Sequence, residues 1–410
     1  MSQSLPQSRH LSRAREIVQL GTVVCLALLV IGIFVVGKDQ FFGSWLFAWL
    51  FWFGLTVGCM GVVMMHHLLG GGWGYLIRRF GEAGGMCVPF MAILFIPIVL
   101  GASHLYPWAV PKMVAEDPVI RHKTGYLNLN FWILRAVFYF LVFWLWAWLL
   151  RVNSLRLDRG PNPRILKRLF NLSSIGEVIY FVLMALAAID WMMSREPHWI
   201  STVFGFIVVM SQAVTALCFL ILMVALHADD PALKPVIRAD YLNDLGNVLL
   251  TFVILWAYMS FGQFLVTWLG NNQDEITWYI HRTDGGWRWV GAALIFLHFL
   301  VPFILLLMRP LKRKLGRLAA IAGGLLFMRV VEVIYWVTPT EFPHEGPWGP
   351  LHWFYAEGMN VLAWLGIGGI WFLAFLWFLK DAPILPIGDF IPVTPVDHGH
   401  GQRPVPATVE

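Results

Sequence analysis

The sequence is poor in charged residues and has no long polar segment. Only 13% of its 410 residues are Asp, Glu, Lys or Arg, whereas 59% are hydrophobic, and the mean hydropathy is +0.69. Soluble globular chains carry about 25% charged residues, so this composition excludes a soluble class. The connections between apolar runs stay below roughly 25 residues, which leaves no room for an inserted soluble domain.

Sequence motifs for redox cofactors and nucleotides are also lacking. The four cysteines have no C-x-x-C spacing, so the sequence has neither an iron–sulfur motif nor a site for covalent haem. No P-loop or dinucleotide-binding fingerprint opens a helix after a strand. A haem b needs a facing histidine pair, but His66, His67 and His227 lie at the ends of apolar runs and His298 has no evident partner. We therefore expect no redox centre and no metal site in this chain.

What the sequence does have is a series of apolar runs long enough to cross a membrane. About 20 helical residues span the roughly 30 Å of hydrocarbon in a bilayer. The runs are continuously apolar instead of alternating, which favours helices over a β-barrel. The sequence predicts an all-α polytopic membrane protein with ten transmembrane helices, at residues 17–36, 44–68, 86–106, 129–150, 170–192, 200–226, 245–269, 288–308, 318–338 and 353–379.

Basic residues are distributed unevenly between alternate connections. With the N-terminus inside, 20 of the 29 Lys and Arg residues fall on the inner side and 7 on the outer side, while Arg135 and Arg329 fall within spans. Loops rich in Lys and Arg stay in the cytoplasm, so both termini are predicted to be cytoplasmic. Basic loops next to anionic lipid account for the pI of about 9.1, which does not indicate nucleic-acid binding.

A four-residue sequence occurs twice inside apolar runs, 155 positions apart. The two copies are Glu177-Val178-Ile179-Tyr180 and Glu332-Val333-Ile334-Tyr335. Other landmarks recur 160 positions on, with His67 matched by His227, Ile77-Arg78 by Ile237-Arg238, and Trp108 by Trp268. These matches predict a duplication in which spans 2–5 and spans 6–9 form two parallel four-helix bundles, flanked by spans 1 and 10.

The predicted organisation has five parts. They are a cytoplasmic tail with a peripheral first span (1–40), a first four-helix bundle (41–195), a second four-helix bundle (196–340), an outer loop with a peripheral tenth span (341–380), and a Pro-rich cytoplasmic tail (381–410).

Ionisable residues within or beside the apolar runs give the main functional signal. An acidic residue at the bilayer centre costs roughly 2.5–3.5 kcal/mol on insertion scales and usually marks a functional pathway. A ladder of protonatable groups at several depths suits proton conduction. The candidates for a proton path are His66, His67, Glu82, Glu177, Asp190, His227, Arg329 and Glu332.

The two repeated glutamates differ in one respect. Glu332 has Arg329 three positions before it, whereas Glu177 has Ser174 at the matching place. Residues three apart on a helix can pair, so Glu332 is expected to be neutralised and Glu177 to be the better group for proton uptake and release. A structural alternative stays open, because Arg329 with Glu332, and Arg135 with an unidentified carboxylate, can be buried ion pairs that only fix helix packing.

Several motifs resemble one family of membrane proteins. They are His66-His67-Leu68-Leu69-Gly70-Gly71-Gly72-Trp73-Gly74, Ile77-Arg78-Arg79 with Glu82, Leu105-Tyr106-Pro107-Trp108-Ala109, and Tyr126-Leu127-Asn128. Over nearly its whole length the chain resembles the integral membrane subunits of alternative complex III, of the NrfD/polysulfide reductase C type, and among these the shorter, ActF-like subunits.

The resemblance implies a multi-pass subunit of a quinol:electron acceptor oxidoreductase in the bacterial inner (cytoplasmic) membrane. Complexes of that family oxidise menaquinol or another quinol and pass electrons through iron–sulfur clusters and haem c. The implied partners are a multihaem cytochrome c subunit, an iron–sulfur subunit and a paralogous NrfD-like membrane subunit. The chain itself would conduct protons, with quinone as a candidate ligand and no redox centre of its own.

The resemblance also suggests where a quinone would bind. In the family the quinol pocket lies at the outer end of the first bundle, and Arg135, Tyr139 and Asp190 are the residues here that could line it. A cation, a phenol and a carboxylate can bind a quinone carbonyl and accept a proton. Two other classes stay open, namely a secondary transporter with parallel repeats and a haem b membrane cytochrome subunit.

Overall fold

The computed structural model describes residues 9–271, 273–283, 286–339, 350–380 and 382–386, and every regular element in these ranges is a helix. Among them, ten segments are long and apolar enough to cross a membrane, which confirms the predicted all-α membrane class. The segments are Val18–Val36, Lys38–Leu69, Gly72–Leu100, Leu129–Leu157, Pro163–Arg195, Phe204–Leu226, Ala239–Gly270, Trp287–Leu307, Leu315–Val337 and Ala356–Leu379.

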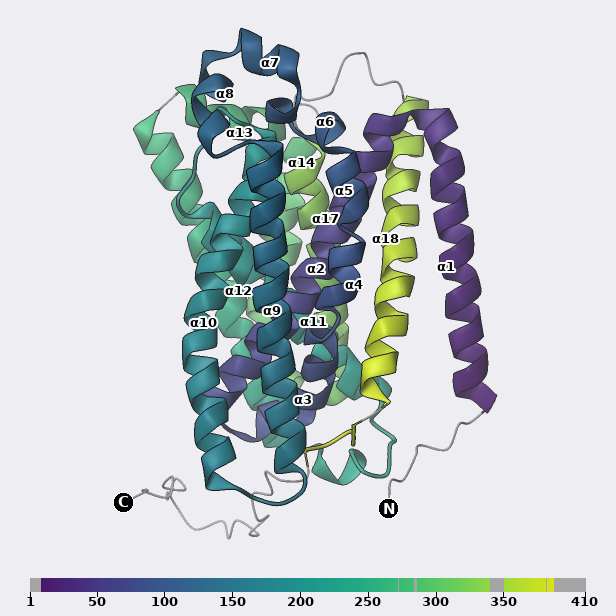
Figure 1. The fold of residues 1–410 in the computed structure, drawn as a ribbon. Helices are drawn as coiled ribbons and strands as arrows, with labels where there is room; N and C mark the ends of the chain where they lie inside the picture. Colours follow the sequence, from purple (N-terminus) through teal and green to yellow (C-terminus); the bar gives the residue numbers. More distant parts are fainter. Residues whose placement is uncertain (1–8, 272, 284–285, 340–349, 381, 387–410) are drawn as a thin grey trace.

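Eight of these crossings are single helices and two are assembled from shorter pieces (Figure 1). The single helices are α1 (Arg9–Val36), α2 (Lys38–Leu69), α9 (Leu129–Leu157), α10 (Pro163–Trp191), α11 (Phe204–Leu226), α12 (Ala239–Gly270), α17 (Leu315–Val337) and α18 (Pro350–Leu379). The third crossing consists of α3 (Gly72–Gly85), α4 (Val88–Ile93) and α5 (Ile96–Leu100), and the eighth of α14 (Trp287–Ala293), the π-helical segment η5 (Leu294–Leu300) and α15 (Val301–Leu307).

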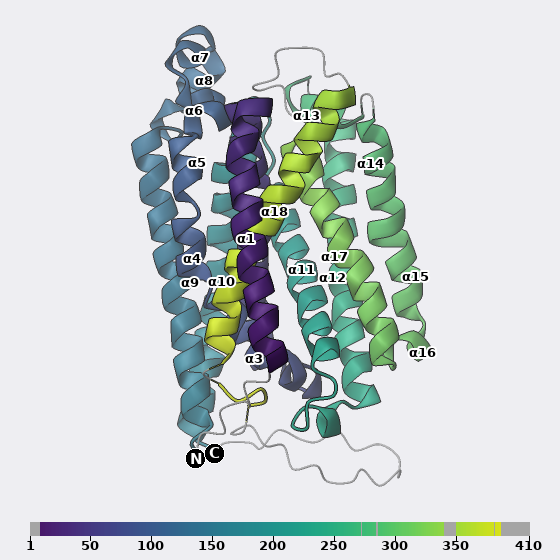
Figure 2. The same ribbon diagram turned by 90° about the vertical axis from the view of Figure 1, so that its right-hand side faces the viewer.

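Short helices lie at both ends of the crossings. Helices α6 (Ala102–Leu105), α7 (Pro111–Glu116), α8 (Pro118–His122) and α13 (Gln273–Thr283) lie at one end, called here the α13 end (Figure 1). Helix α3 begins at the opposite end, called the α3 end, where α16 (Arg309–Lys312) is also found (Figure 2). Helix α1 begins and α18 ends at the α3 end, as an even number of crossings requires (Figure 1).

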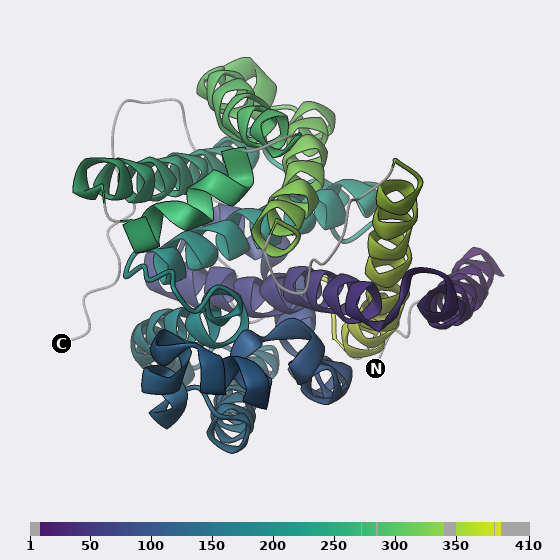
Figure 3. The ribbon, with the colours of Figure 1, turned by 90° about the horizontal axis from the view of Figure 1, so that it is seen from above.

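Helices α2 and α11 occupy the middle of the molecule. They are the most deeply buried of the ten crossings. Helix α2 packs against α3, α10 and α18, helix α11 packs against α12 and α17, and the two central helices pack against each other (Figure 3). A Cβ on Gly58 of α2 would lie 2.4 Å from the backbone oxygen of Gln212, so only glycine allows this close approach. For description, we call the helices from α2 to α10 the first group and the helices from α11 to α17 the second group.

Helix α1 is peripheral. It packs mainly on α18 and crosses its outer face (Figure 2). Large apolar side chains such as Leu20 and Phe34 remain 67% and 88% exposed, which fits contact with lipid. The predicted position of the first span at the edge of the molecule agrees with this packing.

The third crossing begins earlier than the sequence predicted. The sequence predicts this span at 86–106, after a basic turn. In the structure the helical segment begins at Gly72 and ends at Leu100. Arg78, Arg79 and Glu82 are therefore buried within α3, where Glu82 lies 3.5 Å from Arg78 and 2.7 Å from Arg79. Because these charges pair with one another, burial of the segment is tolerated.

Candidate functional site

The three quinone-binding candidates lie in the first group, where two of them, Arg135 and Asp190, form a buried ion pair. Asp190 is fully buried and accepts hydrogen bonds from Arg135 at 2.8 Å (Nε) and 2.7 Å (Nη2), and from the Tyr139 hydroxyl at 2.9 Å. The guanidinium of Arg135 also stacks on the ring of Tyr126, with 3.8 Å between its Cζ and the ring centroid. The structure thus brings the three predicted residues together, and their polar atoms bind one another.

Aromatic rings fill the interior of the first group beside this ion pair. The ring of Trp191 lies 5.7 Å from that of Tyr139, 5.8 Å from Phe140 and 5.0 Å from Trp49, measured between centroids. The indole of Trp132 donates to the backbone oxygen of Asp190 at 2.9 Å. This packing fixes the position of Asp190 on α10.

The proton-path candidates at the α3 end lie near one another, but they contact different partners. His66 faces the backbone oxygen of Gly71 at 3.2 Å, and the His67 ring lies beside it with 5.8 Å between centroids. Glu82 is occupied by its arginine pairs, and the ring of His227 lies near that of Phe80 in α3, with 5.2 Å between centroids. Histidines at the ends of α2 and α11 thus flank α3.

Glu177 lies in the middle of α10 and is half-buried. Within the part of the chain that the structure describes, it forms no ion pair. The preceding Gly176 packs on Met64 of α2 and on Trp146, since a Cβ there would lie 2.5 Å from the Met64 sulfur. The predicted difference between Glu177 and Glu332 is therefore present in the structure.

Glu332 is the centre of a buried polar cluster in the second group. It pairs with Arg329 one turn before it, which confirms the pairing that the spacing predicted. Its Oε1 accepts hydrogen bonds from Trp256 (Nε1, 2.7 Å) and Ser211 (Oγ, 3.1 Å), and its Oε2 lies 3.6 Å from Nε2 of His298. Four helical segments thus converge on one carboxylate that is only 1% exposed.

Sequence reasoning found no partner for His298, and the local helix geometry explains why. His298 lies in η5, where the amide of Val301 donates to the oxygen of Phe296, five residues back. Pro302 follows directly, and proline cannot donate a backbone hydrogen bond. A π-helical turn shifts the side chains that follow it and is frequent at functional sites, but no periodic pattern in the sequence reveals it.

A cavity of about 580 Å³ lies beside this cluster, between α12, α13, α14 and α17. Glu332 lines one side of it, and aromatic side chains supply about half of the other lining residues, including Trp256, Trp278 and Tyr335. Phe261 and Ile295, which also line the cavity, are 63% and 61% exposed. Both lie in crossings, so an opening between them would face lipid.

Helix α13 closes the cavity at the α13 end and is held by a buried ion pair. Arg282 donates to Glu196 at 3.0 Å (Nη1) and to the backbone oxygens of Tyr335 and Trp336 at 3.0 and 2.8 Å, and it stacks on Trp278. Burial opposes ionisation of Glu196, but the side chains of His281 and Arg282 outweigh it, so its pKa lies below the usual 4.5.

Replacing Glu196 with glutamine should loosen α13. Removing one partner of a buried ion pair costs about 3–5 kcal/mol. Because the folded-state pKa of Glu196 is depressed, its stabilisation is fully present above the usual value of 4.5 and is lost as the pH falls through the folded-state pKa. Denaturation in mixed micelles should show a large gap between wild type and Glu196→Gln at pH 7 that narrows at acid pH.

Glu116→Gln is the matched control for this comparison. Glu116 lies in α7 at the same end and faces Lys112 at 4.0 Å, but its side chain is 67% exposed. Exposed pairs contribute little, so this variant should unfold like wild type. An equally small effect of Glu196→Gln at pH 7 would show that the buried pair does not hold α13.

Comparison with protein-family models and with curated proteins found no match for this chain.

Proposed function

We propose that this chain is a membrane subunit of a quinol:electron acceptor oxidoreductase of the alternative complex III type, and that it handles protons beside a quinol pocket in its second group of helices. The observation that carries the proposal is the buried carboxylate of Glu332 in the wall of a 580 Å³ cavity whose opening between crossings would face lipid. Pockets of roughly 300–1,000 Å³ with apolar walls and few polar groups are typical of small-molecule sites.

The chemistry of the cavity suits a quinol. A molecule dissolved in the membrane can enter between Phe261 and Ile295, and its ring can pack against Trp256. The carboxylate of Glu332 can accept a hydrogen bond from a quinol hydroxyl and then its proton, and His298 at 3.6 Å is the next protonatable group. The electrons would leave through the partner subunits, since this chain is proposed to hold no redox centre.

The first group of helices offers a weaker site for quinone. Asp190 already accepts three hydrogen bonds from Arg135 and Tyr139, and none of these three residues lines the 580 Å³ cavity. A ligand there would have to displace a buried ion pair. Glu332 is also held in a buried ion pair, but its carboxylate lines the 580 Å³ cavity, so the second group is favoured. We assign the triad of Arg135, Tyr139 and Asp190 a structural role.

We further propose that the two groups are parallel copies of one unit. The repeated Glu-Val-Ile-Tyr sequence lies on α10 in one group and on α17 in the other, and both helices pack next to the central pair α2 and α11. The bias of Lys and Arg supports a cytoplasmic location for the α3 end and both termini. The proton path would then run from His66, His67, Glu82 and His227 at the inner side towards Glu177 and Glu332.

Extraction in mild detergent tests the proposal. The chain should copurify with a multihaem cytochrome c subunit, an iron–sulfur subunit and a paralogous membrane subunit, and it should bind a menaquinone analogue. A preparation that transports a solute by itself and contains no haem c or iron–sulfur partner would favour the secondary transporter. An α band in the reduced-minus-oxidised spectrum of the isolated chain would favour the haem b class.

A further inference from the structure

Helix α10 of the first group makes a polar contact with the second group. The hydroxyl of Tyr180 donates a hydrogen bond of 2.8 Å to Oε1 of Gln212 on α11, and both residues are buried. The Tyr180 ring lies on Gly61 of α2, where a Cβ would be 3.0 Å from a ring carbon. Because Tyr180 is three residues after Glu177 on the same helix, the contact begins one turn from that carboxylate.

A second polar contact reaches the same place from α17. Nε of Arg329 donates to the Thr215 hydroxyl at 2.8 Å, and Nη1 of Arg329 pairs with Glu332. Thr215 and Gln212 lie three residues apart on α11 and share a face. The Glu332 cluster and the Tyr180–Gln212 contact thus approach each other across one turn of α11.

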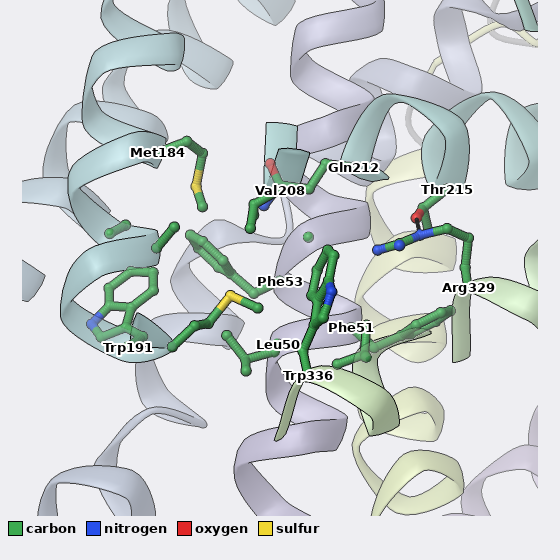
Figure 4. A pocket seen from close by; sticks show the side chains of 15 residues that line it. Leu50, Phe51, Phe53, Met184, Trp191, Val208, Gln212, Thr215, Arg329 and Trp336 are labelled. Carbon is green, nitrogen blue, oxygen red and sulfur yellow. Dashed lines mark hydrogen bonds between the residues drawn. The ribbon is translucent and has the colours of Figure 1, made fainter. Parts of the chain in front are cut away.

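A small cavity lies between these two contacts. It has a volume of about 20 Å³ and is lined by Gln212, Thr215 and Arg329 together with apolar side chains such as Met184 and Val208. Figure 4 shows these polar side chains around the cavity, with the guanidinium end of Arg329 pointing into it. A cavity needs about 10–15 Å³ to hold a water molecule, and buried water occupies polar sites whereas empty cavities are apolar.

We infer that one ordered water molecule occupies this cavity and joins Gln212 to Arg329. The water completes a hydrogen-bonded connection that runs from Tyr180 through Gln212 and Arg329 to Glu332, across the boundary between the two groups of helices. The connection links the helix of Glu177 to the cluster of Glu332. The connection depends only on these side chains, and it does not depend on which ligand the larger cavity binds.

A pair of matched variants tests the water site. Val208→Ile adds a methylene group to a side chain that lines the cavity, whereas Val209→Ile makes the same change one position along α11, where the side chain is equally buried but does not line it. A density map of the full chain that resolves other buried waters should show a peak between Gln212 and Arg329. The peak should be lost in Val208→Ile and retained in Val209→Ile.

Two outcomes overturn the inference, namely an empty cavity in the wild-type map, or a peak that keeps its position in Val208→Ile. Gln212→Leu provides an independent check, because it removes a polar partner without adding bulk, and it too should lose the peak. Proton uptake by the intact complex gives a separate readout that rests on the proposed function. Slower uptake in Val208→Ile alone would tie the water to proton transfer, and unchanged uptake with a lost peak would leave a structural water.

Discussion

Substitution of Asp190 with asparagine is expected to destabilise the chain by about 3–5 kcal/mol, because it leaves the buried charge of Arg135 without its counter-charge. Arg135→Met should cost a similar amount by isolating the carboxylate. The double variant should cost clearly less than the sum of the two, since no uncompensated charge remains. Denaturation in mixed micelles, followed by tryptophan fluorescence, measures all three.

Tyr139→Phe is the control for this double-mutant cycle of Asp190 and Arg135. It removes the 2.9 Å hydrogen bond to Asp190 but leaves both charges paired, so it should cost only about 1 kcal/mol. The triad would be a ligand site, as the family resemblance suggested, if Asp190→Asn and Arg135→Met instead unfolded like wild type and lost affinity for a menaquinone analogue. The cycle therefore decides between a structural and a binding role for these residues.

Substitution of Glu332 with glutamine should weaken binding of a menaquinol analogue by about ten- to a hundredfold. A hydrogen bond to a charged group contributes roughly 1.5–3 kcal/mol, and each 1.4 kcal/mol corresponds to about a factor of ten in affinity. Proton release coupled to quinol oxidation should fall as well, because the neutral amide cannot accept the proton. Equilibrium binding of a labelled short-chain analogue to the purified complex gives the first quantity directly.

Two further variants separate binding from indirect effects. Glu357→Gln makes the same chemical change in α18, where the carboxylate bonds to Asn360 away from the cavity, and it should leave affinity unchanged. Trp256→Phe removes the 2.7 Å hydrogen bond to Glu332 while keeping the charge, so it should weaken binding less than Glu332→Gln. Wild-type affinity in Glu332→Gln would exclude Glu332 from the quinol site.

Features with a local cause could be predicted from the sequence. The ten crossings follow from continuous apolar runs, and the pairing of Arg329 with Glu332 follows from their spacing on one helix. The start of the third crossing could not be predicted, because Arg78 and Arg79 read as a basic turn until their pairing with Glu82 is known. Charge composition alone does not reveal which charges are neutralised.

The site itself depended on contacts between distant positions. Asp190 is 55 residues from Arg135, and His298 and Trp256 come from crossings other than that of Glu332. A cavity is a property of side-chain packing in three dimensions, which the sequence does not show. The family resemblance placed the quinone candidates in the first group, whereas the 580 Å³ cavity lies in the second. Of this cluster, the sequence predicted only Glu332 and its pairing with Arg329 on the same helix.

The π-helical segment η5 separates the eighth crossing into two parts that are offset from each other in rotation about the helix axis. An α-helix advances about 100° per residue, so one additional residue in the wide turn offsets the side-chain directions before and after it by about that angle. Deleting a single residue from Leu294–Leu300 would restore a regular helix and turn His298 away from Glu332, while either flanking part could keep its own lipid-facing side. The crossing thus consists of two short α-helices related by a fixed rotation about the helix axis, and His298 lies in the π-helical segment between them.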